Sequence, residues 1–365
     1  MRTGHAGSLL LALALLSGCA TLADTETGGE NLPNAAAGPF RALRVGELGN
    51  LRSAPNALED DETFPRDPAV LDVDGDPATP AVLGYFAMTP EVPGQDPDPA
   101  APPGAIVRHG ADDGRSFDRM PLVVLTPAEP WEGGTVGAPS VVRVGGEVFL
   151  YYAAAGGIGL ARSPDGAVFT RVQGPVFGPD AAGWEAGAVP RSPGVVVLDD
   201  GSLRLFYEVP GPGDAARIGE ARSDDGITWT RVGDGPALAP ASAPTGEGAE
   251  PPYDGAWVGA PAPVLVRSAE GRSILRVYHA ARDTLGHAVV GLAARFEPAS
   301  AAPLQRAVSP VFGSGSSLGP REPCALVRPG YTLLFTTQRA GRTKSADHPA
   351  VAAGVAPADV TLPAP

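Results

Sequence analysis

The stretch SDDGITW at residues 223–229 reads as a tight turn followed by an aromatic residue. SPDGAVF at 163–169 has the same form, and ADDGRSF at 111–117 has it with one change. Glycine after aspartate is typical of a turn that needs a positive φ. A turn that returns after about 50 to 60 residues indicates a repeated structural unit.

Residues 136–181 and 189–240 are two full copies of this unit. Each holds a valine-rich run and a run with paired aromatics. The segment I-G-x-A-R-S then precedes the turn, and a short run ends the unit. The runs are rich in β-branched and aromatic residues and are bounded by turn residues, which is typical of strands. Four strands in each repeat indicate the blades of a β-propeller.

The same template fits three less regular copies, at 66–125, 258–312 and 321–356. The last copy ends without a fourth strand, whereas residues 39–48 resemble the end of a unit and precede the first copy. An N-terminal strand that completes the last blade would remove an exposed sheet edge. We therefore predict an all-β fold, a five-bladed β-propeller over residues 39–358 whose last blade is closed by an N-terminal strand, with a C-terminal tail at 359–365.

Sialidases offer an alternative count, because they carry a related turn, S-x-D-x-G-x-x-W, in six blades. This chain has one residue fewer before the glycine and no room for a sixth blade. Five blades are the better count.

Charge and cysteine content limit the function. The 365 residues carry a formal net charge of −14, so the chain offers no basic surface for a polyanion, and we expect no nucleic-acid partner. Of the two cysteines, Cys19 lies near the N-terminus, and Cys324 follows a proline at the start of an apolar run. We expect no disulfide, with Cys324 in the core.

The first 18 residues are typical of a secretory signal peptide, with an early arginine and an apolar run from Leu9 to Leu16 that is too short to span a membrane. The last residues, LSGC at 16–19, resemble the bacterial lipobox, which implies cleavage before Cys19 and acylation of that residue. Residues 19–38 would then be the lipidated cysteine and a flexible tether. The resemblance implies a cell-envelope lipoprotein held by its lipid anchor, with the outer membrane favoured by Ala20; an ordinary signal peptide is the alternative.

The repeats resemble the arabinanase and β-fructosidase superfamily, glycoside hydrolase families 43 and 32. The resemblance rests on the S-x-D-G-x-x-W turns, on the LYY segment at 150–152, and on the leaders WEGGTVGAPSV (131–141), WEAGAVPRSPGV (184–195) and YDGAWVGAPAPV (253–264). It implies that the innermost strands begin at a central funnel that faces carbohydrate. It also implies three carboxylates on separate blades.

Cleavage of a glycosidic bond needs one protonated and one ionised carboxyl group. FPRDPAV at 64–70 resembles the R-D-P segment of the superfamily, which implies that Asp67 is the base or nucleophile. Glu208 in FYEV and Glu322 in REPCA are the candidates for the general acid. A strand-capping aspartate and exposed loop carboxylates are the structural alternatives.

Candidate substrate ligands accompany these carboxylates. Three arginines would make the funnel rich in guanidinium groups and favour an anionic or hydroxyl-rich ligand: Arg66, Arg191 and Arg321. His279 ends a second strand where a ligand-binding group could stand. Three tryptophans could stack on sugar rings or pack between blades: Trp131, Trp184 and Trp257.

Other positions weaken the catalytic interpretation. Ala138, Ala260 and Ser192 stand where further carboxylates would be expected, which favours a propeller that binds glycans or acts as a scaffold without cleaving them. The acidic residues after the leader aromatics recur so regularly that we expect a structural contact from them: Glu132, Glu185 and Asp254.

No cofactor is expected. The alternate aspartates Asp72, Asp74 and Asp76 have the spacing of a calcium loop but lack its downstream glutamate, so a polar hairpin turn is preferred. We expect the protein to be a monomer.

Overall fold

The computed structural model describes most of the chain beyond the N-terminal segment. It covers residues 36–48, 56–60, 63–73, 82–89, 98, 101–117, 121–213, 215–242, 250–268, 270–297, 302–313, 319–328, 330–340, 348–360 and 362. The predicted signal peptide and Cys19 lie outside these residues.

Strands dominate the described residues, and they form five antiparallel sheets. Blade one holds β3 (Arg66–Asp72), β4 (Val82–Met88), β5 (Ala105–Ala111) and β6 (Leu122–Leu125). Blade two holds β7 (Gly137–Val144), β8 (Glu147–Ala154), β9 (Gly157–Ser163) and β10 (Thr170–Arg171). Blade three holds β11 (Arg191–Val197), β12 (Leu203–Pro210), β13 (Ala216–Ser223) and β14 (Thr230–Arg231). Blade four holds β15 (Trp257–Arg267), β16 (Ser273–Arg282), β17 (Ala288–Glu297) and β18 (Gln305–Arg306).

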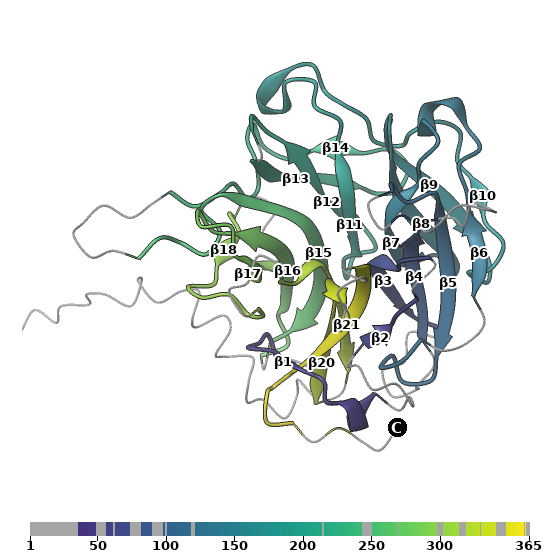
Figure 1. Ribbon diagram of the computed structural model, residues 1–365. Coiled ribbons are helices and arrows are strands. Elements are labelled where there is room, and N and C mark those ends of the chain that lie inside the picture. The colour runs from purple at the N-terminus through teal and green to yellow at the C-terminus, as the bar shows by residue number, and fades with distance from the viewer. Residues whose placement is uncertain are drawn as a thin grey trace, which may run out of the picture.

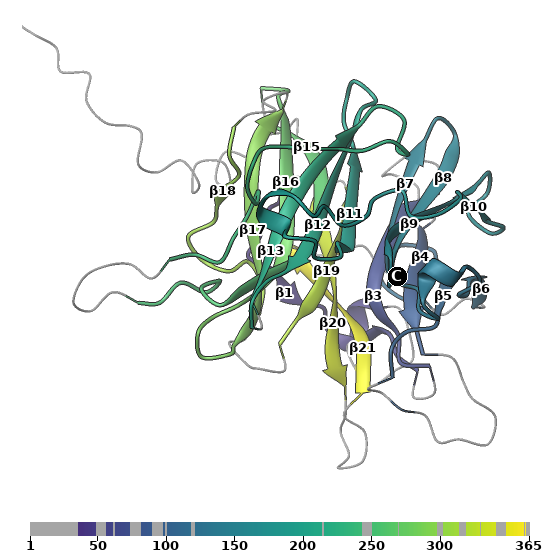
Figure 2. The same cartoon turned by 90° about the horizontal axis from the view of Figure 1, so that it is seen from above.

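Blade five holds β19 (Arg321–Arg328), β20 (Tyr331–Ala340) and β21 (His348–Ala356). The first strands of neighbouring blades contact one another in a ring, from β3 through β7, β11, β15 and β19 back to β3. The sheets therefore stand around a common axis (Figure 1 and Figure 2), and the predicted all-β, five-bladed propeller is confirmed.

Helical structure is limited to short 3₁₀ turns among the described residues: η1 (Val45–Glu47), η2 (Pro130–Glu132) and η3 (Gly183–Glu185). In the part of the chain that the structure describes, no helix has the length and apolar character needed to cross a membrane.

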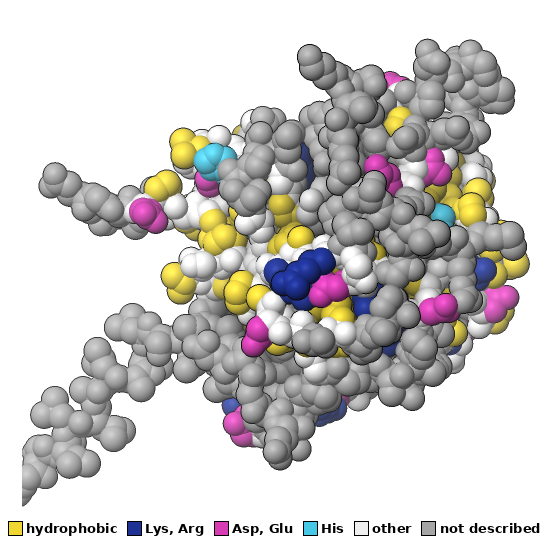
Figure 3. Space-filling model, turned by 60° about the horizontal axis from the view of Figure 1, so that its bottom comes forward, with side chains coloured by type: hydrophobic (Ala, Val, Ile, Leu, Met, Phe, Trp, Pro, Cys, Tyr) yellow, Lys and Arg dark blue, Asp and Glu magenta, His cyan; other side chains and the backbone are white. Residues whose placement is uncertain are grey.

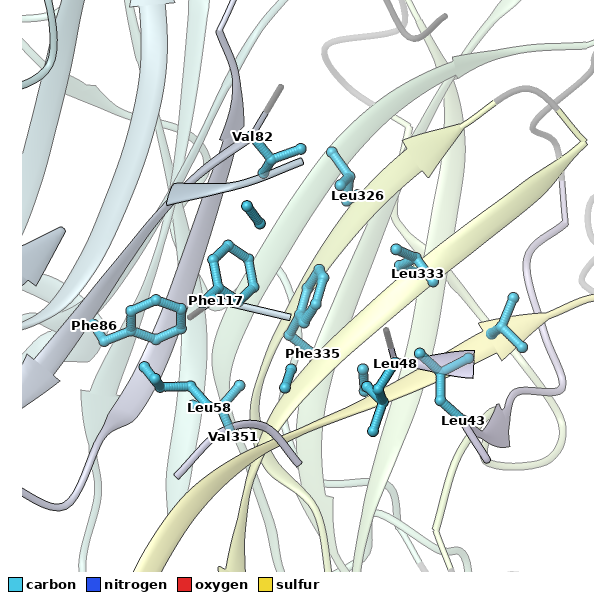
Figure 4. Packing of buried hydrophobic residues seen from close by; sticks show 14 of the residues in the cluster. Leu43, Leu48, Leu58, Val82, Phe86, Phe117, Leu326, Leu333, Phe335 and Val351 are labelled. Atoms are coloured by element: carbon cyan, nitrogen blue, oxygen red, sulfur yellow. The ribbon is translucent and has the colours of Figure 1, made fainter. Parts of the chain in front are cut away.

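The ring is closed in blade five by N-terminal segments. Strand β1 (Arg41–Ala42) pairs with β21, as predicted, and β2 (Asn56–Leu58) pairs with the same strand further along. The sequence did not predict β2. Figure 4 shows the apolar cluster behind this closure, where Leu43, Leu48 and Leu58 pack with side chains of blades one and five.

The repeated D-G turn joins blades one, two and three each to the blade before it in the ring. Gly166 and Gly226 have φ values of 72° and 73°, and their carbonyl oxygens accept hydrogen bonds from the hydroxyls of Tyr85 and Tyr151 in the preceding blade, at 2.8 and 2.7 Å. The aromatic residue after each turn contacts an aromatic ring of the preceding blade in the ring order: Phe169 with Tyr85, Trp229 with Tyr151, and Phe117 with Phe335. The turn is thus a structural contact between blades.

The acidic residues after the leader aromatics make the repeated contact that the sequence predicted. Each accepts a hydrogen bond from an arginine on the outermost strand of its own blade: Glu132 from Arg171, Glu185 from Arg231, and Asp254 from Arg306. All three carboxylates are buried, so each pair satisfies a charge inside its blade.

The outer surface carries both signs of charge. On the face shown in Figure 3, the described basic side chains gather mostly in one compact group beside an acidic side chain, and hydrophobic side chains are scattered between them. This face offers no extended basic stripe among its described residues, in agreement with the acidic composition.

Replacement of Gly226 by alanine tests the turn. A Cβ there would lie 2.7 Å from the Tyr151 hydroxyl, in addition to the strain of a positive φ. Gly233, with a φ of 75° and open space around it, is the matched control. We expect Gly226→Ala to lower the free energy of unfolding by about 1–3 kcal/mol more than Gly233→Ala in chemical denaturation. Equal losses in the two variants would contradict this role of the turn.

Candidate active site

Two cavities meet on the propeller axis. One, of about 700 Å³, opens between the starts of the innermost strands and is within the size range of small-ligand sites. We call it the funnel. The other, of about 620 Å³, is the channel between the innermost strands and is lined mainly by apolar residues. Both cavities are lined by the same five residues, one from each blade: Asp67, Ala138, Ser192, Ala260 and Glu322.

These five residues form a ring with an unusual backbone. Their φ values lie between 44° and 51°, each stands before a proline, and the strand register shifts at each one. A non-glycine residue with a positive φ is strained, and a bulge changes the direction of its side chain. The bulge repeats in every blade, so the fold itself points one residue of each blade at the axis.

A second ring lies at the ends of the second strands. The residues paired with the position before each bulge are Ala87, Ala153, Glu208, Ala280 and Thr337. Of the ten positions in the two rings, only three hold carboxylates, namely Asp67, Glu208 and Glu322. These are the three candidates named from the sequence, and all three line the funnel.

Asp67 and Glu322 form a carboxyl pair. Burial, the negative charge of Glu322 and a hydrogen bond with that side chain together raise the pKa of Asp67 well above its usual range. Oε2 of Glu322 is buried without a hydrogen-bond donor among the described residues. Two carboxyls close together cannot both ionise readily, so deprotonation of Asp67 is disfavoured beside Glu322.

The backbone fixes Asp67 in this pair. The backbone N–H of Ala138 in the next blade donates to Oδ2 of Asp67 at 2.9 Å, and the N–H of Asp67 donates to Oγ1 of Thr337 at 2.9 Å. The sequence analysis did not name Thr337, although it ends the second strand of blade five as Glu208 ends that of blade three. That equivalence is the signal that could have found it.

Glu208 is held in a different environment. Its Oε1 accepts hydrogen bonds from Nε of Arg191 at 2.8 Å and Nη2 at 2.6 Å, and its Oε2 accepts one from the backbone N–H of Ala260 at 3.1 Å. The residue is only 3% exposed, while the Arg191 side chain above it is half-exposed. These charge-assisted donors suit an ionised carboxylate.

Ala138 and Ala260 therefore do not simply mark lost carboxylates. Each supplies the backbone N–H that holds the carboxylate of the preceding blade, and each follows a glycine. A Cβ on Gly259 would lie 2.3 Å from Oε2 of Glu208, and one on Gly137 would lie 3.6 Å from Oδ2 of Asp67 and 2.8 Å from Pro103. The G-A-P segments make room for the acidic side chains beside them.

The three predicted arginines have three different environments. Arg66 donates from Nη2 to Oγ1 of Thr89 at 2.5 Å and to the carbonyl of Ala101 at 2.7 Å, so it holds the two ends of a loop and does not line the funnel. Arg191 covers Glu208. Arg321 lines the funnel and is exposed, with no ion-pair partner among the described residues. Arg282, which the sequence analysis did not name, lines the funnel as well.

The remaining predicted ligands are mostly outside the funnel. Trp257 lines it, but Trp131 stacks on Tyr152 at 6.0 Å and Trp184 packs in the core of blades two and three, so the inter-blade alternative holds for these two. His279 is fully buried inside blade four, where burial lowers its pKa to about 4, and it does not line the funnel.

The metal and thiol candidates are separate from the carboxylates. Asp72 forms an ion pair with Arg328 at 2.7 Å, and Asp74 and Asp76 lie outside the described residues. Cys324 lines the channel, and burial raises the pKa of its thiol to about 12, as expected for a core cysteine without reactivity.

Substitution of Asp67 by asparagine tests the carboxyl pair. Because the pKa of Asp67 is higher in the folded protein than the ordinary value near 3.9, the folded state keeps a proton that the unfolded state has lost. The stability of the wild type therefore falls as the pH rises above about 4, until the folded-state pKa is passed. Asparagine keeps the hydrogen bonds and removes this loss.

We expect the stability of Asp67→Asn relative to the wild type to rise with pH across this window, measured by chemical denaturation between pH 4 and pH 8. The exposed Asp234→Asn is the control for the loss of one carboxyl group. A stability difference that stays constant with pH would contradict the raised pKa of Asp67.

Comparisons with known proteins bear on the fold. No family profile matches the sequence, and no curated protein is similar to it. Among solved structures, a thermostable family-43 glycoside hydrolase is similar with a TM-score of 0.56 and 16% identity, over 83% of this chain and 96% of that one. An endo-arabinase from Bacteroides thetaiotaomicron is similar with a TM-score of 0.52 and 14% identity, over 80% and 97%. A family 117 glycoside hydrolase from Zobellia galactanivorans gives 0.55 and 15%, over 87% and 89%. At these identities the similarity establishes the fold, and the resemblance predicted from the repeats is confirmed at that level.

Proposed function

We propose that the protein is a glycoside hydrolase that cleaves glycosidic bonds by a two-carboxylate mechanism in the funnel. The observation that carries the proposal is the unequal environment of the carboxylates. Burial beside Glu322 raises the pKa of Asp67, whereas Glu208 accepts hydrogen bonds from a guanidinium and a backbone N–H. Carboxyl groups in environments that separate their protonation states are what acid and base roles require.

We propose roles that differ from the sequence-based prediction. Burial, together with the charge and hydrogen bond of Glu322, raises the pKa of Asp67, which suits the general acid. We therefore assign Asp67 and Glu322 together as the acid. Glu208, on the wall of the same funnel, is the ionised partner.

In this reaction the Asp67–Glu322 pair gives its proton to the oxygen of the leaving sugar as the glycosidic bond breaks. Glu208 stabilises the positive charge that develops on the sugar ring and supports attack at the anomeric carbon, from its own oxygen or through water. The buried N–H groups of Ala138 and Ala260 keep both carboxylates in place. Their backbone cannot rearrange without breaking the ring of bulges.

One observation favours a second function, glycan binding without cleavage. Glu208 is almost fully buried, and it accepts its hydrogen bonds from Arg191 and from the backbone of Ala260. A substrate must displace Arg191 before Glu208 can act on it. A propeller in which that displacement does not occur would hold carbohydrate in the funnel and release it unchanged.

The two functions are separated by turnover. We expect the full-length protein to hydrolyse at least one aryl-glycoside or polysaccharide among arabinan, xylan, levan and pectin. Asp67→Asn and Glu208→Gln should each lower kcat/KM at least about 100-fold, because each removes an acid–base group. Glu147→Gln, which changes an exposed carboxylate on β8, is the control and should keep full activity.

Retention of the folded wild type on an immobilised glycan without release of product would instead support the binding function. Full activity of Asp67→Asn would contradict the proposed acid.

We also propose that the chain is a cell-envelope lipoprotein acylated at Cys19. The support is the LSGC segment at 16–19 after an apolar run. We expect radiolabelled palmitate to be incorporated into the wild type and not into Cys19→Ser. Equal labelling of the two would contradict the proposal.

A further inference from the structure

The funnel gathers arginines in a protein that is strongly acidic. Among the described residues that line it, three arginines, Arg191, Arg282 and Arg321, face three carboxyl groups, and burial beside Glu322 raises the pKa of one of these, Asp67. The rest of the described lining is alanine, glycine, proline and serine, with Trp257 as the one aromatic residue. The whole chain carries a formal charge of −14, so this concentration of guanidinium groups differs from the composition of the molecule as a whole.

Arg321 is the arginine whose charge is not used inside the protein. It occupies the same position in blade five that Arg66 has in blade one and Arg191 in blade three, directly before the ring residue. Arg66 is bound to the loop ends and Arg191 to Glu208, but Arg321 is exposed and pairs with no acidic residue among those described. Arg321 directly precedes Glu322 in the sequence, so it lies next to the carboxyl pair.

We propose that the funnel recognises an anionic sugar, and that Arg321 binds the carboxylate of a uronic acid residue next to the bond to be cleaved. This inference rests on the proposed carbohydrate site and specifies its substrate class. A guanidinium group can donate two parallel hydrogen bonds to a planar carboxylate. A neutral hydroxyl offers no such matching pair of acceptors.

The low-dielectric walls of the funnel strengthen this selection. Ala280 of the second ring and Ala138 and Ala260 of the first line the funnel, so the described residues of blades two and four bring no acidic side chain into it. A positive cavity with apolar walls concentrates anions at its mouth. A neutral pentose chain would gain nothing from this field.

Calorimetric titration of the full-length protein separates these ligands. The probes are oligogalacturonate, a neutral arabino-oligosaccharide of the same length, and a sulfated galacto-oligosaccharide, at low salt and pH 7. We expect oligogalacturonate to bind at least about tenfold more tightly than the neutral chain, and to weaken as salt is added. Arg321→Gln should remove most of this difference, and Arg321→Lys, which keeps the charge without the fork, should remove less.

Arg222→Gln is the matched control, because it removes one exposed arginine from β13, outside the funnel. It should bind oligogalacturonate as the wild type does. Circular dichroism of each variant shows that it is folded.

Three results would overturn the inference. They are equal affinity for the neutral chain and oligogalacturonate, unchanged binding in Arg321→Gln, and tighter binding of the sulfated chain, which would replace the carboxylate by a sulfate ester. Because binding is measured without turnover, a protein that binds oligogalacturonate through Arg321 but cleaves nothing would contradict the hydrolase proposal alone. Cleavage of arabinan without selective anion binding would contradict this inference alone.

Discussion

In blade five, β21 would be left with an unpaired edge if the chain supplied nothing further, and β1 and β2 hydrogen-bond to that edge from the other end of the chain. This pairing places blade five against blade one, where the rings of Phe117 and Phe335 meet at 5.6 Å. The same junction brings Glu322, at the start of β19, to Asp67, at the start of β3. The closure that stabilises the propeller therefore also creates the carboxyl pair.

Buried carboxylates are costly unless they receive hydrogen bonds or share a proton. In this protein the hydrogen bonds come from a bulge that the fold repeats in all five blades. At three of the five bulges the backbone N–H donates to the preceding blade, and two of these groups hold Asp67 and Glu208. The blades without a carboxylate carry alanine or serine at the same points, so the acidic residues stand on one scaffold in which only the side chains differ.

The charges of the funnel follow from the same comparison between blades. Three blades have arginine before the ring residue, and two have glycine, where a side chain would collide with Glu208 or Pro103. Arg66 and Arg191 donate hydrogen bonds within the protein, whereas Arg321 is available to a ligand. We therefore propose that one exposed guanidinium beside the Asp67–Glu322 pair sets the specificity of this funnel, a combination that a neutral sugar would not need.

The sequence by itself determined the number of blades, the D-G turns with their glycines at positive φ, the missing fourth strand and the three carboxylates. Strand periodicity and turn chemistry are local, and a repeat multiplies their signal. Which side chains of neighbouring blades contact one another is determined only by the tertiary structure. It alone showed that Asp67 lies against Glu322, that Ala138 and Ala260 act through their N–H groups and that Arg66 holds a loop. It also showed that Trp131 and Trp184 pack between blades and that His279 is buried. These contacts join residues far apart in the chain, and no spacing along one strand specifies which side chain a neighbouring blade will bring opposite it.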